Sequence, residues 1–331
     1  MNAWIADFMA GTYQFSPRIR YHFSDETLEV WEYRDRLILS LLLGQIKSTF
    51  SHLVSPVCCH LQGPNGVKTA ITGIRNALAD REFQYVIRAD IRSYYASIDR
   101  KILLRQVQEC FDDPRVFNYL NAIITAPIDD GGRLLTPDQG IPRRSSVSPF
   151  FGALYLSSLD RAFQQCPGVF YLRYMDDFII LAQTKRQFVR ARKKLYTILR
   201  ELKLKLSPSK TRMGKIHAGY HFLGVQFSAS QNSKTKSQVM VASIHSRSCH
   251  RALDKVRTKQ TDAVHPANIQ RYLLQWSTWW ARIVCPLTAL DLIRSWVIHT
   301  ESFEPDSVWL GRGWLISSLR FISAPTLTMI I

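Results

Sequence analysis

Three aspartates follow or separate short apolar stretches of the chain. Asp90 ends one such stretch, and the pair Asp176-Asp177 lies between two others, residues 170–174 and 178–181. Carboxylates beside apolar strands are costly to bury unless a cation compensates them. Hard divalent ions such as Mg²⁺ prefer carboxylate oxygens, and two such ions about 3.5–4 Å apart catalyse phosphoryl transfer to a 3′ hydroxyl group. The aspartates therefore predict a two-metal site, although an aspartate pair alone is also common in ordinary turns.

The segments around these aspartates are predicted to hold them on rigid strands. Residues 85–90 have the composition of a short buried strand, and residues 170–181 predict a β-hairpin with Asp176 and Asp177 at its tip. Elsewhere, periodic apolar residues predict helices. The predicted helices cover roughly residues 28–49, 68–79, 100–110 (with Asp99 as N-cap), 150–163, 187–202 and much of 244–320, and 220–227 is predicted as a further strand. This mixture is typical of an α+β fold.

The chain is strongly basic. Its 331 residues carry a formal charge of +17, and twelve Lys and Arg residues against the single acid Glu201 are concentrated in segment 185–215. Such unbalanced charge indicates a polyanionic partner such as nucleic acid. We expect this segment to contact phosphates, with Arg190, Lys193 and Lys194 on one side of its helix. A solvated outer helix face is the alternative.

Other features restrict the class of protein. The six cysteines form no Cys-x-x-Cys pair, which favours a reducing compartment over a disulfide framework. The N-terminal residues lack the basic and apolar regions of a signal peptide. The longest apolar run, Leu37 to Leu43, is too short for a transmembrane helix. We therefore expect a cytoplasmic protein that does not act at a membrane.

Five short motifs occur in order along the chain. They are Asp90-Ile-Arg-Ser-Tyr-Tyr-Ala-Ser-Ile-Asp99, Gln139-Gly-Ile-Pro-Arg-Arg-Ser-Ser-Val-Ser-Pro149, Tyr174-Met-Asp-Asp177, Leu206-Ser-Pro-Ser-Lys-Thr211 and Tyr220-His-Phe-Leu-Gly224. They resemble motifs A to E of reverse transcriptases, in the family's order and near its spacings. The resemblance covers roughly residues 34–227. It is strongest to bacterial enzymes of the group II intron-like lineage, which includes retron and phage-defence reverse transcriptases.

The resemblance implies how a metal site is built. Asp90, Asp176 and Asp177 would be the catalytic residues and would bind two Mg²⁺ ions, with Mn²⁺ as a substitute. The backbone carbonyl of Ile91 would add a further ligand.

The resemblance also implies how substrates are held. Tyr95 resembles the bulky residue that lies under the sugar and excludes a 2′-hydroxyl group, which would favour deoxynucleotides; Tyr94 is an alternative, and ordinary packing is the alternative for both. Motif B usually contains Gln-Gly where this chain has two arginines, so the loop's usual base-pair monitoring is not implied here. The residues expected to bind nucleotide are Tyr95, Arg143, Arg144, Lys210, Arg36 and Lys68, and those expected to grip the primer are Phe222, Leu223 and Gly224.

The fold implied by the resemblance is a right-hand polymerase of the α+β class. Its palm would contain an antiparallel sheet with the Tyr-Met-Asp-Asp hairpin. The expected divisions are residues 1–84 for the N-terminal segment and fingers, 85–230 for the palm with inserted fingers elements, and 231–331 for a helical thumb and C-terminal tail.

The activity implied is RNA-directed DNA polymerisation, in which dNTPs are added to a 3′ end in a bacterial phage-defence or retron-like system. The expected partners are an RNA template and a DNA or RNA primer; a dedicated non-coding RNA, a partner protein and self-association are left open. The main rival is a non-catalytic, maturase-like RNA-binding protein, which the three intact aspartates disfavour. An RNA-dependent RNA polymerase would usually have Gly-Asp-Asp and a small polar residue in place of Tyr95, and a palm-domain nucleotide cyclase would lack the motif B loop.

Overall fold

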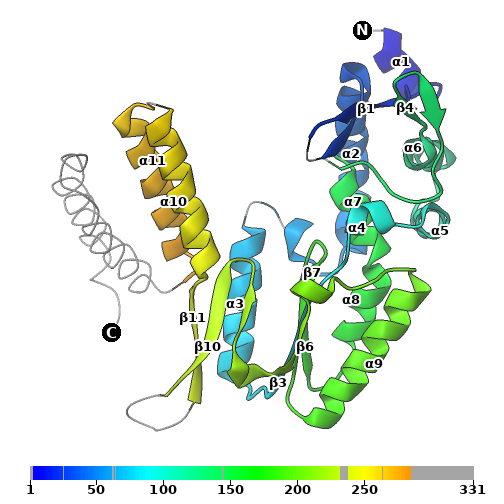
Figure 1. Cartoon of the computed structure of the whole chain (residues 1–331). Coiled ribbons are helices and arrows are strands. Elements are labelled where there is room, and N and C mark those ends of the chain that lie inside the picture. The colour runs from blue at the N-terminus through cyan, green and yellow to red at the C-terminus, as the bar shows by residue number, and fades with distance from the viewer. Residues whose placement is uncertain are drawn as a thin grey trace. The chain divides into compact units, whose positions relative to one another are not determined.

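The computed structural model describes residues 3–24, 26–61, 63, 65–143, 145–231, 238–262 and 264–284 (Figure 1). The chain divides into two compact units. The first contains residues 1–223 and 231–240, and the second contains residues 224–230 and 241–331.

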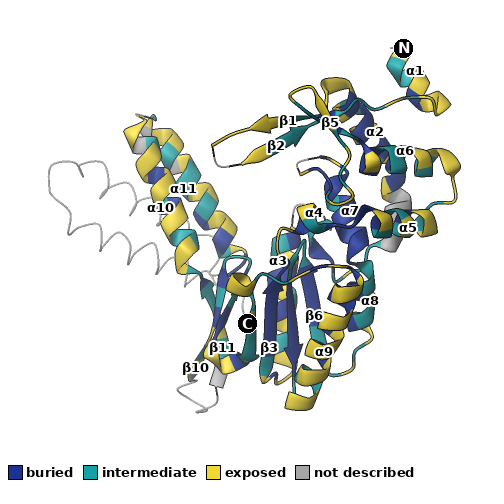
Figure 2. Ribbon diagram, turned by 45° about the vertical axis from the view of Figure 1, so that its right-hand side comes forward, coloured by how far each residue is buried: buried dark blue, intermediate teal, exposed yellow. Residues whose placement is uncertain are grey.

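A four-stranded antiparallel sheet forms the centre of the first unit. Its strands follow the order β6-β7-β3-β8. Burial is nearly complete along β3 and β7, as the dark strands of Figure 2 show. The strand and the hairpin predicted from the sequence are confirmed. The strands are β3 (Tyr85–Asp90), β6 (Val169–Tyr174), β7 (Asp177–Ala182) and β8 (Arg212–Lys215).

Helices pack against both faces of this sheet. On one face, Tyr85 and Tyr171 contact aromatic rings of α9 and α8, with 5.2 Å between ring centroids in each pair. On the other face, Leu172 lies against Gly73 of α3. The helices predicted over 68–79 and 187–202 are confirmed. The three helices are α3 (Gly66–Asp80), α8 (Ser157–Gln164) and α9 (Lys185–Glu201).

A second sheet of the first unit has the strand order β2-β1-β4-β5. Arg18 and Arg20 of β1 form ion pairs with Glu29 of β2, at 2.7 and 2.9 Å. The prediction of one helix over 28–49 is therefore wrong at its start, because that stretch begins as a strand paired with β1 and the helix begins only at Tyr33. Pairing with the preceding strand β1 overrides the apolar pattern that predicted a helix. The elements are β1 (Arg18–His22), β2 (Thr27–Val30), β4 (Ile128–Asp130), β5 (Arg133–Leu135) and helix α2 (Tyr33–Leu53).

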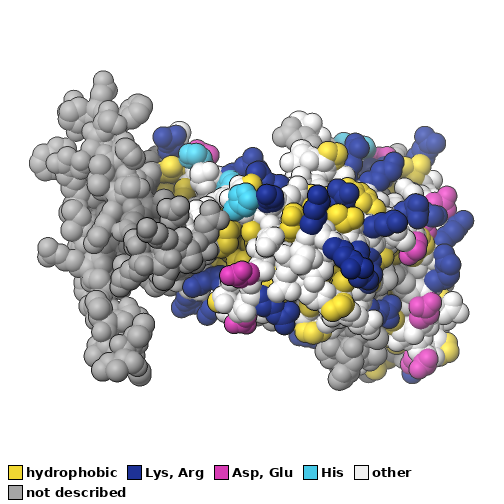
Figure 3. All heavy atoms as spheres, turned by 90° about the horizontal axis from the view of Figure 1, so that it is seen from below, with side chains coloured by type: hydrophobic (Ala, Val, Ile, Leu, Met, Phe, Trp, Pro, Cys, Tyr) yellow, Lys and Arg dark blue, Asp and Glu magenta, His cyan; other side chains and the backbone are white. Residues whose placement is uncertain are grey.

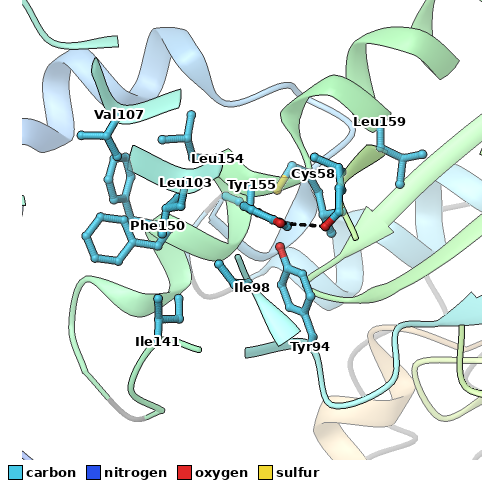
Figure 4. Close-up of a cluster of buried hydrophobic side chains, with 14 of the residues drawn as sticks. Cys58, Tyr94, Ile98, Leu103, Val107, Ile141, Phe150, Leu154, Tyr155 and Leu159 are labelled. Atoms are coloured by element: carbon cyan, nitrogen blue, oxygen red, sulfur yellow. Dashed lines mark hydrogen bonds between the residues drawn. The ribbon is translucent and has the colours of Figure 1, made fainter. Parts of the chain in front are cut away.

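The single helix predicted over 150–163 is two helices. The first, α7 (Ser148–Tyr155), ends before the buried residue Leu156, and α8 begins directly after that residue. The break lets α7 pack against α5 while α8 packs against β6. The Tyr155 hydroxyl donates to the Leu202 carbonyl at 2.7 Å and lies in the buried apolar cluster of Figure 4.

The helix predicted over 100–110 is confirmed with its cap. The Asp99 carboxylate accepts the backbone N–H of Ile102 at 3.0 Å. The remaining helices of the first unit are α1 (Ala3–Ala10), α4 (Tyr94–Ser97), α5 (Arg100–Cys110), α6 (Pro114–Thr125) and the short 3₁₀ helices η1 (Cys59–Leu61), η2 (Pro208–Lys210) and η3 (Ile216–Ala218).

The single strand predicted over 220–227 is interrupted. Leu223 and Gly224 both have positive φ, 48° and 81°, and form a two-residue turn of the kind that joins hairpin strands. An added Cβ at Gly224 would lie 2.9 Å from both Ser248 Oγ and Trp280 Cη2, so glycine is required there. The strand before the turn is β9 (Tyr220–Phe222), and the elements after it are β10 (Val225–Gln231), β11 (Gln238–Ile244), α10 (Ser246–Thr261) and α11 (Pro266–Ala281).

Helices α10 and α11 confirm the first part of the helical region predicted over 244–320, and residues 285–320 lie outside the described residues. Among the helices that the structure describes, none combines the length and the apolar character needed to cross a bilayer.

Candidate active site

The three predicted aspartates lie together at one end of the central sheet. Asp90, the last residue of β3, is directly opposite Asp177, the first residue of β7. Asp176 comes just before, in the turn that follows β6. Because side chains alternate along strands, Asp90 and Asp177 share the face on which α3 packs, opposite to α8 and α9.

Two cationic side chains bind these carboxylates. Lys210 Nζ donates to both oxygens of Asp90, at 3.1 and 3.3 Å. Arg88, two residues before Asp90 on the same face, donates from Nη2 to Asp177 Oδ1 at 3.0 Å. The segment before Lys210 runs beside the end of β3, where the Ser207 N–H donates to the Asp90 carbonyl at 2.8 Å. This contact explains how the lysine reaches the site.

Burial and mutual repulsion raise the pKa of two carboxylates. Burial is the main cause for Asp177, whose pKa rises to about 6, while Arg88 opposes the rise and Asp90 adds to it. Burial also raises the pKa of Asp176, and the charge of Asp90 contributes. The ionised forms of these two carboxylates are therefore disfavoured, a cost that a bound divalent cation would relieve.

The carboxylates do not yet converge as metal ligands. Within the described residues, no three His, Cys, Asp or Glu side chains form a ready metal-binding cluster. Instead, Lys210 holds Asp90 and Arg88 holds Asp177. These two cations stand in for part of the charge that a metal ion would supply.

A cavity of about 380 Å³ opens beside the carboxylates. This volume is in the range of pockets that hold a small molecule. Of the predicted site residues, Arg144 lies outside the described residues. Arg143 is exposed at the cavity wall, where its charge lowers the pKa of Asp176 against the larger effect of burial. The lining residues are Asp90, Ile91, Arg92, Ser93, Tyr94, Tyr95, Arg143, Asp176, Ser207 and Lys210.

The two neighbouring tyrosines differ in burial. Tyr94 is buried, and its hydroxyl donates to the Gly152 carbonyl at 2.5 Å. Tyr95 is half-buried at the cavity wall, where burial and then the charge of Asp176 raise its pKa to about 12. An added Cβ at Gly152 would lie 3.5 Å from the Tyr95 ring, so the ring rests on the α7 backbone. The geometry thus favours Tyr95 as the residue facing a bound ligand, and its role in sugar selection stays a prediction.

Other predicted residues are not brought to the cavity. Arg36 in α2 and Lys68 in α3 are exposed, and neither occurs among the described residues that line it. Phe222 is buried, and Leu223 and Gly224 form the turn after β9. The roles of these five residues stay predictions.

The basic helix α9 lies on the sheet face opposite to the carboxylates. Arg190, Lys193 and Lys194 border a shallow hollow of about 540 Å³ beside α8. Lys194 Nζ donates to the Ala162 carbonyl at 3.0 Å. Figure 3 shows one surface of the molecule on which Lys and Arg side chains outnumber Asp and Glu.

Three residues near the hairpin were not found by sequence reasoning. The sequence could have indicated Arg88, because a residue two positions before Asp90 on a strand lies on the same face of the sheet. For Arg173 the sequence pattern was weaker, a single charged residue within an apolar strand. Nothing in the sequence indicated His60, since it lies 115 residues before Met175, the hairpin residue that it contacts.

Comparisons with known proteins agree with the geometry. The model of the family "Reverse transcriptase (RNA-dependent DNA polymerase)" matches residues 29–227. Protein YkfC of Escherichia coli (strain K12) is 23% identical over 260 residues, which cover 66% of this chain and 68% of YkfC.

Among solved structures, telomerase from Candida albicans, in complex with a fragment of telomeric RNA, matches with a TM-score of 0.50 and 12% identity over 71% of this chain. Apo telomerase from Candida tropicalis, truncated from its C-terminal domain, matches with a TM-score of 0.47 and 16% identity over 61% of this chain. The chain spans less than half of these telomerase chains, 48% and 45%. The match to the Candida albicans telomerase shows a similarity of fold alone.

Proposed function

This chain belongs to the reverse transcriptase family of RNA-directed DNA polymerases, and we propose that it extends a 3′ end with deoxynucleotides at the cavity beside Asp90 and Asp176. One observation carries the proposal: Asp90 and Asp177 are cross-strand partners, with Asp176 in the adjoining turn. Three carboxylates brought together in this way suit divalent metal ions, and the pKa values of Asp176 and Asp177 are raised.

Members of this family use divalent metal ions, and we propose that the carboxylate oxygens of this site bind two Mg²⁺ ions. Asp90, Asp176 and Asp177 would hold them, with the Ile91 carbonyl as a further ligand. When bound, the ions would lower the pKa of the attacking 3′ hydroxyl and neutralise charge on the triphosphate. Arg88 and Lys210 must then release the carboxylates. Lys210, 59% exposed at its side chain, can turn toward the phosphates.

The cavity wall suggests how a nucleotide is held. The Tyr95 ring would lie under the sugar and exclude a 2′-hydroxyl group. Arg143 and Lys210 would face the phosphates, because both are exposed cations at the wall. Arg144, Arg36 and Lys68 are further proposed contacts.

The architecture suggests the parts of a right-hand polymerase. The central sheet would be the palm, within residues 85–230. Residues 1–84 would form the N-terminal segment and fingers, and 231–331 a thumb with its tail, with Phe222 to Gly224 as primer grip. Helices α10 and α11 support the helical character of the proposed thumb.

The biological setting that we propose is bacterial, in the group II intron-like lineage. The similarity to YkfC supports a bacterial origin. A retron or phage-defence system would supply the RNA template, with a dedicated non-coding RNA or a protein partner as open possibilities. A non-catalytic, maturase-like role is disfavoured, because all three carboxylates are present. Asp90 and Asp176 line the cavity, and Asp177 lies directly opposite Asp90 on the next strand.

Joint replacement of Asp176→Ala and Asp177→Ala tests the function. Incorporation of dNTPs on an RNA template should be abolished. Binding of template–primer in a gel-shift assay should persist, since basic residues spread over the surface supply most of the affinity. Incorporation at the wild-type rate by the double variant would overturn the assignment.

A further inference from the structure

The turn of the aspartate hairpin is held by its backbone. Met175 has a φ of 56°, a left-handed conformation that is uncommon for a residue other than glycine. Its N–H donates to His60 Nδ1 at 3.1 Å, and its carbonyl accepts from Arg173 Nη1 at 2.9 Å. Such a conformation persists only where the surroundings enforce it. Here, two side chains hold the two polar groups of the residue that precedes Asp176.

The contact from Arg173 rests on a buried ion pair. Arg173 Nε donates to Asp160 Oδ1 at 2.8 Å, Nη2 donates to the other carboxylate oxygen, and Nη2 also donates to the Ala153 carbonyl at 3.3 Å. The Tyr171 hydroxyl donates to the same carboxylate at 2.7 Å. With its guanidinium bonded on every side, Arg173 is a fixed anchor for the Met175 carbonyl.

The contact from His60 comes from a separate segment. The Arg173 N–H donates to the Val57 carbonyl at 2.8 Å, which attaches that segment to the edge of β6. An added Cβ at Gly66 would lie 2.3 Å from the Cys59 carbonyl oxygen, so α3 approaches the segment too closely for any other residue. The position of His60 is therefore set by β6 on one side and α3 on the other.

The protonation state of His60 fits its bonds. Its Nε2 lies 3.3 Å from the Pro149 carbonyl, which can only accept, so Nε2 carries the proton and Nδ1 accepts from Met175. Burial, and then the charge of Arg173, lower the pKa of His60 to about 4. The ring is thus neutral at neutral pH and joins the hairpin to Pro149 in the first turn of α7.

We propose that His60 is a positioning residue for the catalytic hairpin: its Nδ1 holds the Met175 amide while Arg173 holds the Met175 carbonyl, and together they fix Asp176 and Asp177 for metal binding. The proposal rests on the proposed function, because it presumes that these carboxylates bind metal. Neither His60 nor Arg173 lies among the described residues that line the cavity.

Two substitutions separate hydrogen bonding from packing. His60→Phe keeps an aromatic ring but removes the hydrogen bonds of His60 to Met175, Pro149 and the Cys58 thiol. His60→Gln has an amide that can accept from Met175 and donate to Pro149. Tyr13→Phe is the matched control, since it removes another part-buried hydrogen bond, the 2.7 Å bond to Asp35. Each protein is compared per folded molecule, with the folded fraction taken from thermal unfolding.

The first readout is hydrogen exchange in the segment 170–180, measured on the full chain without substrate. We expect faster exchange in His60→Phe, and rates near wild type in His60→Gln and in the control. This readout does not depend on catalysis. Unchanged exchange in His60→Phe would overturn the positioning role of His60 even if the protein proves to be an active polymerase.

The second readout is binding of Mn²⁺ with template–primer present, together with steady-state kinetics. In His60→Phe we expect weaker Mn²⁺ binding and a loss of kcat of about ten- to a hundredfold, with little change in the KM for dNTP. His60→Gln should restore much of both. Equal or better activity in His60→Phe than in His60→Gln would show that packing alone matters. If the wild type binds no Mn²⁺ and incorporates no dNTP, the proposed function fails. If hydrogen exchange still behaves as expected in that case, His60 holds the hairpin turn as proposed.

Discussion

Aspartates are paired with basic residues on both faces of the central sheet, but in different ways. On the α8 face, Asp160 and Arg173 have side-chain exposures of 2% and 0%. On the opposite face, Asp90 is paired with a Lys210 that is 59% exposed, and Asp177, itself 26% exposed, with Arg88. We call Asp160–Arg173 the closed pair, because it is shielded from water. We call Asp90–Lys210 and Asp177–Arg88 the open pairs, because they lie at or beside the cavity.

The difference in burial determines at which ion pair a metal ion can replace the basic side chain. Around Asp160 each carboxylate oxygen has a bonded partner, and Arg173 has further bonds to backbone carbonyls. Opening such a pair would leave a buried charge unpaired. Around Asp177 the carboxylate keeps a raised pKa despite Arg88, so the compensation there is incomplete. We infer that the closed pair serves structure and the open pairs can give way to a metal ion.

Removing one partner of the closed pair should have the largest effect. Arg173→Met leaves Asp160 buried without its cation, and we expect a loss of about 3–5 kcal/mol in the free energy of unfolding. Denaturant unfolding measures this loss. The double variant Arg173→Met with Asp160→Leu should regain most of the stability, since an apolar pair often replaces an ion pair without cost. Its dNTP incorporation should stay low, because Met175 still lacks the donor to its carbonyl. Full activity in the double variant would contradict the anchoring role of Arg173.

At the open site, the ligand-facing tyrosine should control the choice of sugar. Tyr95→Ala opens the space under the sugar, so we expect the preference for dNTP over NTP to fall by about ten- to a hundredfold. The measurement is kcat/KM for a dNTP and for its matching NTP. Tyr94→Phe is the control, because it keeps the ring and loses only the bond to the Gly152 carbonyl. An unchanged ratio in Tyr95→Ala would remove the sugar gate from this residue.

Metal binding at the open pairs should depend on pH, whereas the closed pair should stay ionised over the same range. The pKa of Asp177 is raised to about 6 in the folded protein. Because this pKa is higher than that of an aspartate in the unfolded chain, protonation of Asp177 stabilises the metal-free folded protein at low pH. This stabilisation is lost as pH rises through about 6. Metal ions require the ionised form. Mn²⁺ affinity should rise by up to about tenfold per pH unit between pH 5 and 6 and then level off. Isothermal titration at several pH values measures it, and a midpoint near 4 would show that Asp177 is not raised.

Local sequence patterns were sufficient for the elements that carry the carboxylates. The apolar stretches of β3, β6 and β7 and the periodic faces of α3 and α9 are properties of short segments, and the structure has them where they were predicted. The break at Leu156 depends on what α7 and α8 pack against, so a window of sequence could not reveal it. The strand β2 pairs with the nearby strand β1, and the apolar pattern that predicted a helix over 28–49 gave no indication of this pairing.

The candidate site shows the same limit. The resemblance identified Asp90, Asp176 and Lys210, which all line the cavity. It gave no indication of Arg88 or His60, because their importance lies in which atoms they reach. A histidine 115 residues from its partner is visible only once β6 has brought the two segments together.

The smallest effect is expected from the basic helix α9. From sequence alone, replacing Arg190, Lys193 and Lys194 by Gln would flatten the salt slope of template–primer binding by about two to three units, if all three contact phosphate. The structure places α9 on the face of the sheet opposite to Asp90 and Asp177. A duplex whose 3′ end reaches those carboxylates would lie along the other face, so we now expect a change in slope of less than about one unit. Gel-shift titrations between low and moderate salt measure the slope, with Lys210→Gln as a control on the carboxylate face. A flattening by two units or more in the triple variant would show that nucleic acid also binds the α8 and α9 side, and the two faces would then differ less than their ion pairs indicate.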